Sequence, residues 1–216
     1  MHHPHYDRIP ELDDERNLIE VRVSDLQPTQ MCVGMAEVRA RQRDFSQESS
    51  KGRLDDLRGK PVPLVRNQLG ELWMVDRHHR MRALLEMDAD VTTYGYVIAV
   101  LESDSRDAAL LALQERGWLY LHDGRGNGPL EPSALPQSLL GLDDDPYRSL
   151  IWKLKSEGLI KPQPLIPYHE FRWGAWLRTR PLPPFSSSQL NPALPASRRL
   201  AQSRAAAHLA GWTGKS

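Results

Sequence analysis

The chain has 216 residues, of which 40% are hydrophobic and 26% are charged, and its 28 basic side chains equal its 28 acidic ones. This composition is that of a folded protein with room for one substantial domain, and it excludes a largely disordered chain. The balanced charge predicts no overall field toward nucleic acid or a membrane, and the single cysteine, Cys32, excludes a disulfide framework and a multi-cysteine metal site.

The N-terminal residues 1–17 are polar and include two prolines, so we expect them to form a mobile arm. This region lacks the apolar stretch of a signal peptide. No apolar run in the chain approaches the ~20 residues that a membrane span needs. The expected compartment is therefore the cytoplasm, with no membrane contact.

Strand and helix patterns alternate over the next hundred residues. The predicted elements are, in chain order, a strand (18–23), a turn (24–29), a helix (33–49), a break (59–61), a hairpin of two strands (62–65 and 71–75), a helix (77–87), a strand (91–101) and a helix (104–116).

The second half of the chain predicts helices only. A Gly- and Pro-rich loop (121–136) precedes a helix over 146–157, for which Asp145 is a natural N-cap and Pro146 the first helical residue. A second helix is expected over 169–179, then a Pro/Ser linker and a weakly helical end. The predicted fold class is α+β: a core of residues 18–125 with a small mixed sheet, a helical annex (126–180) and a basic Pro/Ser/Ala-rich tail (181–216).

The neutral total hides an asymmetry, because no acidic residue follows Glu170. The seven bases beyond that point are Arg172, Arg178, Arg180, Arg198, Arg199, Arg204 and Lys215. This basic segment is expected either to lie against the acidic body, or against a partner subunit in a homodimer, or to contact a polyanion such as nucleic acid.

The segment with chemical promise lies between the strand 71–75 and the helix 77–87. In its seven residues, Asp76 to Arg82, five are His or Arg. Cations at a helix N-terminus oppose the positive end of the helix dipole, which indicates that an anion such as phosphate binds there. Asp76 is expected to cap the helix. The alternative is a solvated basic turn with His78 as a partly buried, hydrogen-bonded histidine.

The strand–Asp-Arg-His-His-Arg–helix unit resembles the central motif of the ParB/sulfiredoxin superfamily, and the chain most closely resembles the ParB-like nuclease family. The matching stretches are VSDLQPTQMCVG (23–34), PVPLV (61–65), LWMVDRHHRMRALLEM (72–87), RGWLYLHDGRG (116–126), DDPYRSLIWKLKSEG (144–158) and EFRWGAWLRTR (170–180). The resemblance implies a ParB/sulfiredoxin-like core in which the helix mouth binds the phosphate of a nucleotide or nucleic acid.

The resemblance also implies which residues bind the phosphate. They come from the helix mouth and from the loop after the first strand, namely Asp76, Arg77, His78, His79, Arg80, Thr29 and Gln30. Arg80 is expected to form a bidentate pair with the phosphate.

Catalytic roles are expected for His78, His79 and Glu37. His78 stands where sulfiredoxins hold a cysteine, so it is expected to act as an acid, a base or a phosphate acceptor. Glu37 is the expected general base, because related phosphotransfer sites use a carboxylate near a strand-to-helix junction. The polar loop 122–126 is a candidate lid.

Three functions remain open at this point: a nuclease or phosphodiesterase (a hydrolase), a nucleotide-dependent small-molecule kinase acting on a substrate such as an amino acid, and a non-catalytic nucleotide- or DNA-binding module. Without a cysteine at position 78, sulfinic acid repair is not expected. A Mg²⁺ ion accompanying a nucleotide is the cofactor that the resemblance allows, and the metal requirement stays open.

Overall fold

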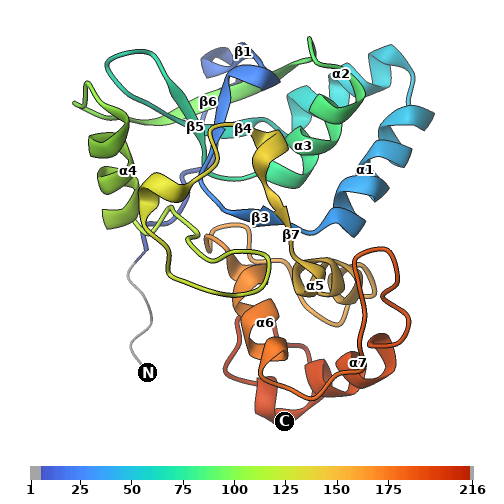
Figure 1. Ribbon diagram of the computed structural model, residues 1–216. Helices are drawn as coiled ribbons and strands as arrows, with labels where there is room; N and C mark the ends of the chain where they lie inside the picture. Colours follow the sequence, from blue (N-terminus) through green and yellow to red (C-terminus); the bar gives the residue numbers. More distant parts are fainter. Residues whose placement is uncertain (1–5, 215–216) are drawn as a thin grey trace.

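The sheet of the computed structural model, which describes residues 6–214, has five strands in the order β1-β6-β4-β5-β2 (Figure 1). These strands are β1 (Ile19–Arg22), β2 (Leu26–Pro28), β4 (Val62–Arg66), β5 (Leu72–Met74) and β6 (Thr92–Val100). β6 pairs antiparallel with β1 and parallel with β4, whereas β5 pairs antiparallel with β4 and parallel with β2. The predicted mixed sheet and its β4–β5 hairpin are confirmed.

Helices cover both faces of this sheet. α1 (Met35–Gln47), α2 (Ser50–Gly59) and α3 (His78–Met87) lie on one face, and α4 (Arg106–Glu115) lies on the other. Alternation along β5 serves the two layers, because Met74 packs with the first cluster while Trp73 and Val75 pack with the second. Packing on both faces therefore holds the end of β5, from which the chain continues into α3.

Two elements near the sheet differ from the prediction. β2 occupies residues that we expected to be a turn, and it accommodates Pro28 because an edge strand need not donate every ladder hydrogen bond. α2 was not predicted, since Leu57 is its one buried apolar side chain and its helical periodicity is correspondingly weak.

The helical part contains α5 (Pro146–Ser156), α6 (His169–Arg178) and α7 (Leu194–Gln202), which share a third apolar cluster. The N-cap prediction for α5 is confirmed: Asp145 accepts hydrogen bonds from the N–H groups of Tyr147 and Arg148, and Pro146 is the first helical residue. Residues 6–214 also form five short 3₁₀ helices: η1 (Glu15–Asn17), η2 (Val23–Asp25), η3 (Pro132–Ala134), η4 (Leu139–Gly141) and η5 (Arg204–Ala206).

A small parallel ladder joins the two parts of the molecule, between β3 (Cys32–Val33) and β7 (Asp143–Asp144). The N-terminus of α1 is capped across the same junction. The N–H of Met35 donates to Asp144 Oδ1 at 3.0 Å, and the N–H of Ala36 donates to Ser149 Oγ at 3.1 Å. Gly34 allows this approach, because a Cβ atom there would lie 2.7 Å from the backbone nitrogen of Ser149.

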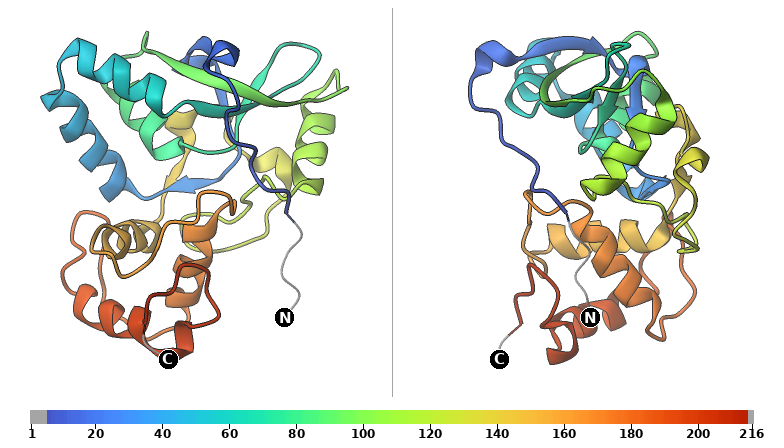
Figure 2. Two further views of the ribbon diagram at one scale, coloured as in Figure 1. Left: turned by 180° about the vertical axis from the view of Figure 1, so that it is seen from behind. Right: turned by 90° about the vertical axis from the view of Figure 1, so that its left-hand side faces the viewer.

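The described part of the N-terminal segment, residues 6–17, packs against the core (Figure 2). Ile9 is buried, the indole N–H of Trp118 donates to the Asp7 carbonyl at 2.9 Å, and the Tyr96 hydroxyl donates to the Pro10 carbonyl at 2.9 Å. These contacts attach residues 7–10 to the core; the mobile arm stays a prediction, and residues 1–5 lie outside the described chain.

The expected tail packs on the helical part over its described residues, 181–214. Its apolar side chains, among them Phe185, Leu194 and Trp212, join the third cluster. Arg198 forms two hydrogen bonds of 2.8 Å with Glu157. Its position agrees with the expectation that the basic segment lies against the acidic body.

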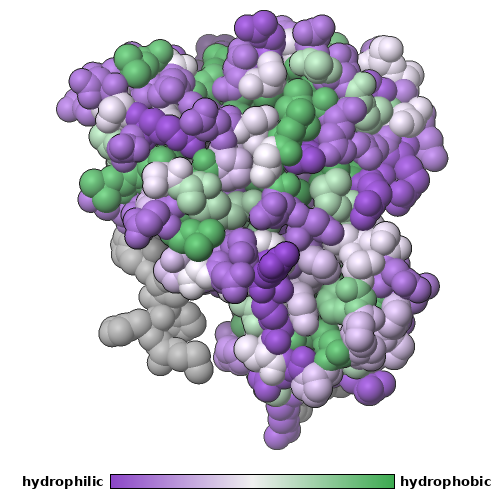
Figure 3. All heavy atoms as spheres, viewed as in Figure 1, coloured by the Kyte–Doolittle hydropathy of each residue, from purple (hydrophilic) through white to green (hydrophobic). Residues whose placement is uncertain are grey.

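None of the helices formed by residues 6–214 combines the length and the apolar character needed to cross a bilayer. On the face drawn in Figure 3, apolar side chains form small groups separated by polar ones. The homodimer stays a prediction.

Candidate functional site

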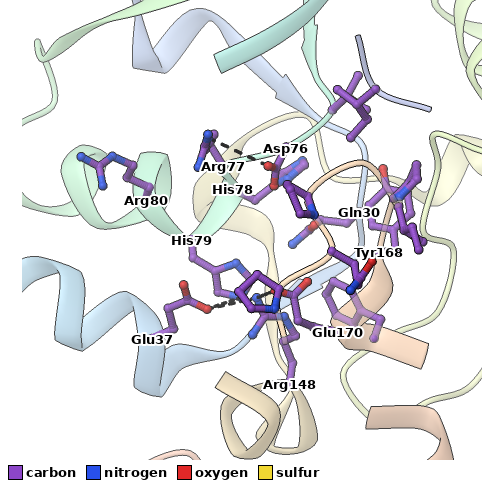
Figure 4. Close-up of a pocket in the computed structure, with 18 of the residues that line it drawn as sticks. Gln30, Glu37, Asp76, Arg77, His78, His79, Arg80, Arg148, Tyr168 and Glu170 are labelled. Atoms are coloured by element: carbon purple, nitrogen blue, oxygen red, sulfur yellow. Dashed lines mark ion pairs between the residues drawn. The ribbon is translucent and has the colours of Figure 1, made fainter. Parts of the chain in front are cut away.

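A pocket of about 300 Å³ lies where α3 and the first turn of α1 meet α5, α6 and the segment that connects α5 with α6 (Figure 4). Its polar and charged lining residues are Gln30, Glu37, Arg41, Lys60, Asp76, Arg77, His78, His79, Arg80, Arg148, Lys155, Gln163, Tyr168 and Glu170. Seven of the eight residues expected in the site line this one cavity. The eighth, Thr29, lies behind its wall.

Two helices begin at this pocket in the same unusual way. The N-cap of α3 is Arg77, with φ +74°, and the N-cap of α6 is Tyr168, with φ +53°; neither helix has a side-chain cap. They are the only left-handed residues other than glycine among residues 6–214. Such backbone conformations cost about 1–3 kcal/mol each and cluster at functional sites. The expected cap by Asp76 is wrong, because the helix begins one residue later.

The two histidines of α3 have the same hydrogen-bond arrangement. His78 Nε2 accepts the backbone N–H of Thr29 at 3.1 Å, and His79 Nε2 accepts the backbone N–H of Gly34 at 2.9 Å. An imidazole nitrogen that accepts a hydrogen bond carries no proton, so the proton of each neutral ring lies on Nδ1. In each ring, Nε2 is therefore bound to the backbone, and the Nδ1–H group remains as a donor.

Both imidazoles are neutral at physiological pH. Burial, with a smaller effect of His79, lowers the pKa of His78 to about 3. Burial and then the Arg148 charge lower the pKa of His79 to about 3, in spite of the nearby Glu37. The roles of His78 and His79 as acid, base or phosphate acceptor stay predictions, and this hydrogen bonding favours neutral N–H donors.

A chain of alternating charges runs from the core into the helical part. Glu37 Oε2 lies 3.0 Å from Arg148 Nη2, which lies 3.9 Å from Glu170 Oε1, and Glu170 in turn pairs with Lys155. Burial alone would raise the pKa of Glu37, but His79, Arg148, Lys155 and Arg41 outweigh it and lower the pKa to about 2.

Glu170 is held ionised in a similar way. Burial opposes its charge, yet Arg148, His169 and Lys155 hold its pKa well below the ordinary value. Arg148 is only 4% exposed, and its Nε and Nη1 atoms have no hydrogen-bond acceptor among the described residues. This guanidinium, satisfied at Nη2 alone, lines the pocket from the α5 side, and Figure 4 shows it directed toward Glu37 and His79.

The third pocket carboxylate, Asp76, has a different setting. Its side chain is 52% exposed, and its nearest cationic atom is Arg77 Nε at 3.9 Å. The protein around the pocket raises the pKa of Asp76 by desolvation, against the opposing effect of Arg77.

Three phosphate-binding candidates, Arg80, Thr29 and Gln30, make contacts within the protein that the sequence did not predict. Arg80 lines the pocket, but its guanidinium pairs with Asp56 and lies 5.0 Å over the Phe45 ring (Figure 4), and the expected phosphate clamp stays a prediction. Thr29 is fully buried, and its hydroxyl donates to the Met74 carbonyl at 2.8 Å. Gln30 lines the pocket, although its amide donates to the Cys32 carbonyl at 2.6 Å.

The loop 122–126 packs on the helical part and does not cover this pocket. A Cβ atom on Gly124 would lie 2.2 Å from the Asp144 carbonyl oxygen, and the Arg178 guanidinium packs over Gly126. The candidate lid is therefore wrong. Cys32 is buried, and burial raises the pKa of its thiol, which agrees with a packing role.

The sequence interpretation missed the pocket residues that come from the helical part: Arg148, Lys155, Tyr168 and Glu170. A signal for two of them was present, since Arg148 and Lys155 stand seven residues apart, on one face of a helix with a clear N-cap. Within residues 6–214, no group of three or more His, Cys, Asp or Glu side chains is placed to hold a metal ion. The Mg²⁺ that accompanies a nucleotide stays a prediction.

Comparisons with known proteins found one family model and a similar solved structure. A family model described as "Putative ParB-like nuclease" matches residues 19–179. The crystal structure of protein Atu1540 from Agrobacterium tumefaciens is similar, with a TM-score of 0.80 and 27% sequence identity over 92% of this chain and 99% of that chain. No curated protein matches.

Proposed function

This chain belongs to the ParB-like nuclease family, and from that membership we propose that its pocket binds a phosphate group of a nucleotide or nucleic acid and hydrolyses a phosphodiester bond there. The observation that carries the proposal is the meeting of two helix N-termini, those of α3 and α6, at one cavity without side-chain caps. The first N–H groups of a helix lack intrahelical acceptors and carry the positive end of the dipole, which makes such a meeting point suitable for an anion.

The charges around the cavity support the same ligand. The pairs Glu37–Arg148 and Glu170–Lys155 balance one another. In all, six cationic residues and three carboxylates line the cavity. Lys60 and Arg80 both pair with Asp56, and Arg41 lies near Asp44, so counting these two outside carboxylates leaves an excess of one cation. The local excess is positive although the whole chain is neutral.

The neutral histidines support a phosphate ligand as well. With Nε2 engaged by the backbone, His78 and His79 each offer an Nδ1–H group, and donors of this kind bind phosphate oxygens without adding charge. A cavity of about 300 Å³ is at the small end of ligand pockets, so we expect a mononucleotide or one nucleotide of a single strand.

Arg77→Ala tests the phosphate pocket. Arg77 is the exposed cation at the mouth of α3, so its removal is expected to weaken binding of thymidine monophosphate and of a short single-stranded oligonucleotide about 10-fold, the scale of one charge-assisted hydrogen bond. Fluorescence anisotropy or calorimetry at two salt concentrations measures this, with Mg²⁺ and with EDTA.

The matched control is Arg66→Ala, since Arg66 is an exposed arginine of β4 outside the pocket and should bind like the wild type. Equal affinities of the two variants for every ligand would remove the phosphate site. Phosphate binding without hydrolysis would leave a non-catalytic binding module, and transfer of a nucleotide's phosphate to a small molecule would make the protein a kinase.

A further inference from the structure

We propose that Asp76 is the catalytic base of the pocket, a role that rests on the proposed phosphodiester hydrolysis. The inference starts from a conflict in charge. An anion site built from two helix N-termini nonetheless contains a carboxylate that faces the cavity, next to the mouth of α3. That carboxylate repels a bound phosphate, so a site selected for affinity alone would omit it.

The Asp76 side chain interacts with its sequence neighbour. It does not cap α3, whose N-cap is Arg77; its carboxylate lies 3.9 Å from Arg77 Nε and accepts from the Arg77 backbone N–H. The adjoining backbone is strained at Arg77, with φ +74°, and this conformation sets the direction in which the chain leaves β5. A cavity-facing carboxylate that is bound to its sequence neighbour, on a strained turn, is an arrangement suited to a group that takes part in chemistry.

The other two carboxylates of the pocket are already engaged. Glu37 is bound to Arg148 and flanked by Arg41, and Glu170 is bound to Lys155. Both have lowered pKa values, which makes them weak bases, whereas the pKa of Asp76 is raised. Carboxylates whose surroundings move their pKa values apart divide into structural ions and acid–base groups.

The reaction step is simple. A water molecule attacks phosphorus while Asp76 takes its proton, and a new P–O bond forms. The P–O bond to the leaving oxygen breaks, and its electron pair stays on that oxygen, which takes a proton from solvent. The products are a phosphate monoester and an alcohol, and Asp76 returns its proton to water.

The wild-type rate should depend on pH in a way set by the groups that face Asp76. These are Arg77 beside it, Lys155 on α5, Glu170 and the Tyr168 hydroxyl at the start of α6, and Tyr96 on β6. A base acts when ionised, so kcat/KM should rise with pH through a midpoint above the ordinary aspartate pKa of 3.8.

The experiment compares Asp76→Asn with Asp25→Asn, which changes an exposed carboxyl outside the pocket, in the full chain. Anisotropy with a labelled single-stranded oligonucleotide measures affinity, and release of p-nitrophenolate from bis(p-nitrophenyl) phosphate, with Mg²⁺ and with EDTA, measures turnover. Asp76→Asn should bind the oligonucleotide at least as tightly as the wild type does. Its rate of phosphodiester hydrolysis should be lower by a factor of about 100 or more, the usual effect of losing a general base. Asp25→Asn should match the wild type in both.

Each outcome bears on one of the two proposals. Hydrolysis by Asp76→Asn at the wild-type rate would overturn the role of Asp76. So would a wild-type kcat/KM that does not fall at acidic pH. Binding without hydrolysis by the wild type would overturn it too, while leaving the phosphate pocket intact. Absence of any binding by the wild type would instead remove the proposed function. The wild-type pH profile keeps the test decisive if Asp76→Asn does not fold.

Discussion

His78 and His79 each accept a hydrogen bond from the core through Nε2. Each receives a backbone N–H that has no place in a helix or a strand ladder, from Thr29 and Gly34 respectively. Protonation at Nε2 would break that bond and place a charge in a buried site, which is costly. The histidines therefore make the fold sensitive to acid before any carboxylate does.

Stability should fall as the pH drops below about 6.5, the ordinary pKa of histidine. The unfolded chain takes up protons at both residues from that pH downward, whereas the folded chain does so only near pH 3, so the unfolded state binds more protons over the whole window. At pH 5 the loss approaches about 2 kcal/mol for each histidine.

Urea denaturation at pH 7.5, 6 and 5 measures this loss. In His78→Gln, the amide oxygen replaces Nε2 as the acceptor, so the dependence on pH should be about half as steep as in the wild type. A wild-type free energy of unfolding that stays constant from pH 7.5 to 5 would contradict the neutral, buried histidines.

At the scale of elements, the start of α3 combines two effects at one residue. Arg77 supplies a cation to the pocket and also adopts a left-handed backbone that suits glycine better than arginine. We therefore expect Arg77→Gly to be more stable than Arg77→Ala by about 1 kcal/mol, because only the alanine keeps the strain.

Both variants should lose phosphate affinity equally, because both lose the same cation. Urea denaturation and anisotropy on the two proteins separate strain from charge. A glycine variant less stable than the alanine variant would show that the left-handed turn is not strained.

Elements with strong local signals were predictable from the sequence. The start of α5 combines a capping carboxylate at Asp145 with Pro146 at the first helical position, and no tertiary contact is needed to recognise it. The hairpin of β4 and β5 is similarly local. By contrast, α2 has a single buried apolar side chain, Leu57, and β2 is a three-residue edge strand held by its pairing with β5.

Only the part of the site that lies on consecutive residues was predictable from the sequence. The run Asp76–Arg80 lies on consecutive residues, so its proximity to the helix mouth follows from the sequence. Its orientation does not: Arg80 turns toward Asp56 on an unpredicted helix, and the start of α3 depends on the backbone conformation of Arg77. Arg148 and Glu170 reach the pocket only through the packing of α5 and α6 on the core.

At the scale of the whole molecule, the C-terminal segment closes the helical part. The Lys161 N–H donates to the Gly211 carbonyl at 2.7 Å, and the Trp173 indole N–H donates to the Ala210 carbonyl at 2.8 Å. These bonds and the apolar contacts of α7 hold α5 and α6, the helices that bring Arg148 and Glu170 to the pocket.

Deletion of residues 181–216 should therefore lower the helix content and the melting temperature, and it should abolish phosphate binding by disordering α5 and α6. The matched control is Arg199→Gln/Arg204→Gln, which removes two exposed bases that form no ion pair among residues 6–214 and keeps the packing. Circular dichroism and anisotropy of a single-stranded oligonucleotide over a salt series compare the two proteins.

The double variant should keep the wild-type affinity and salt slope. A flatter salt slope in the double variant would mean that the C-terminal bases contact the polyanion directly, and a stable, binding-competent truncated protein would mean that the segment is dispensable.

The pocket wall comes from both parts of the molecule, with α1 and α3 on one side and α5 and α6 on the other. A ligand seated there would therefore join two parts that already contact each other through the β3–β7 ladder, the cap of α1, the stacked rings of Tyr120 and Phe171, and ion pairs. At a free ligand concentration of 100 times its dissociation constant, binding would add about 2.7 kcal/mol to the free energy needed to separate the two parts. The abundance of a small phosphate compound would then govern the lifetime of the assembled chain, and scarcity would leave the helical part the first to open and the first to be cut by a protease.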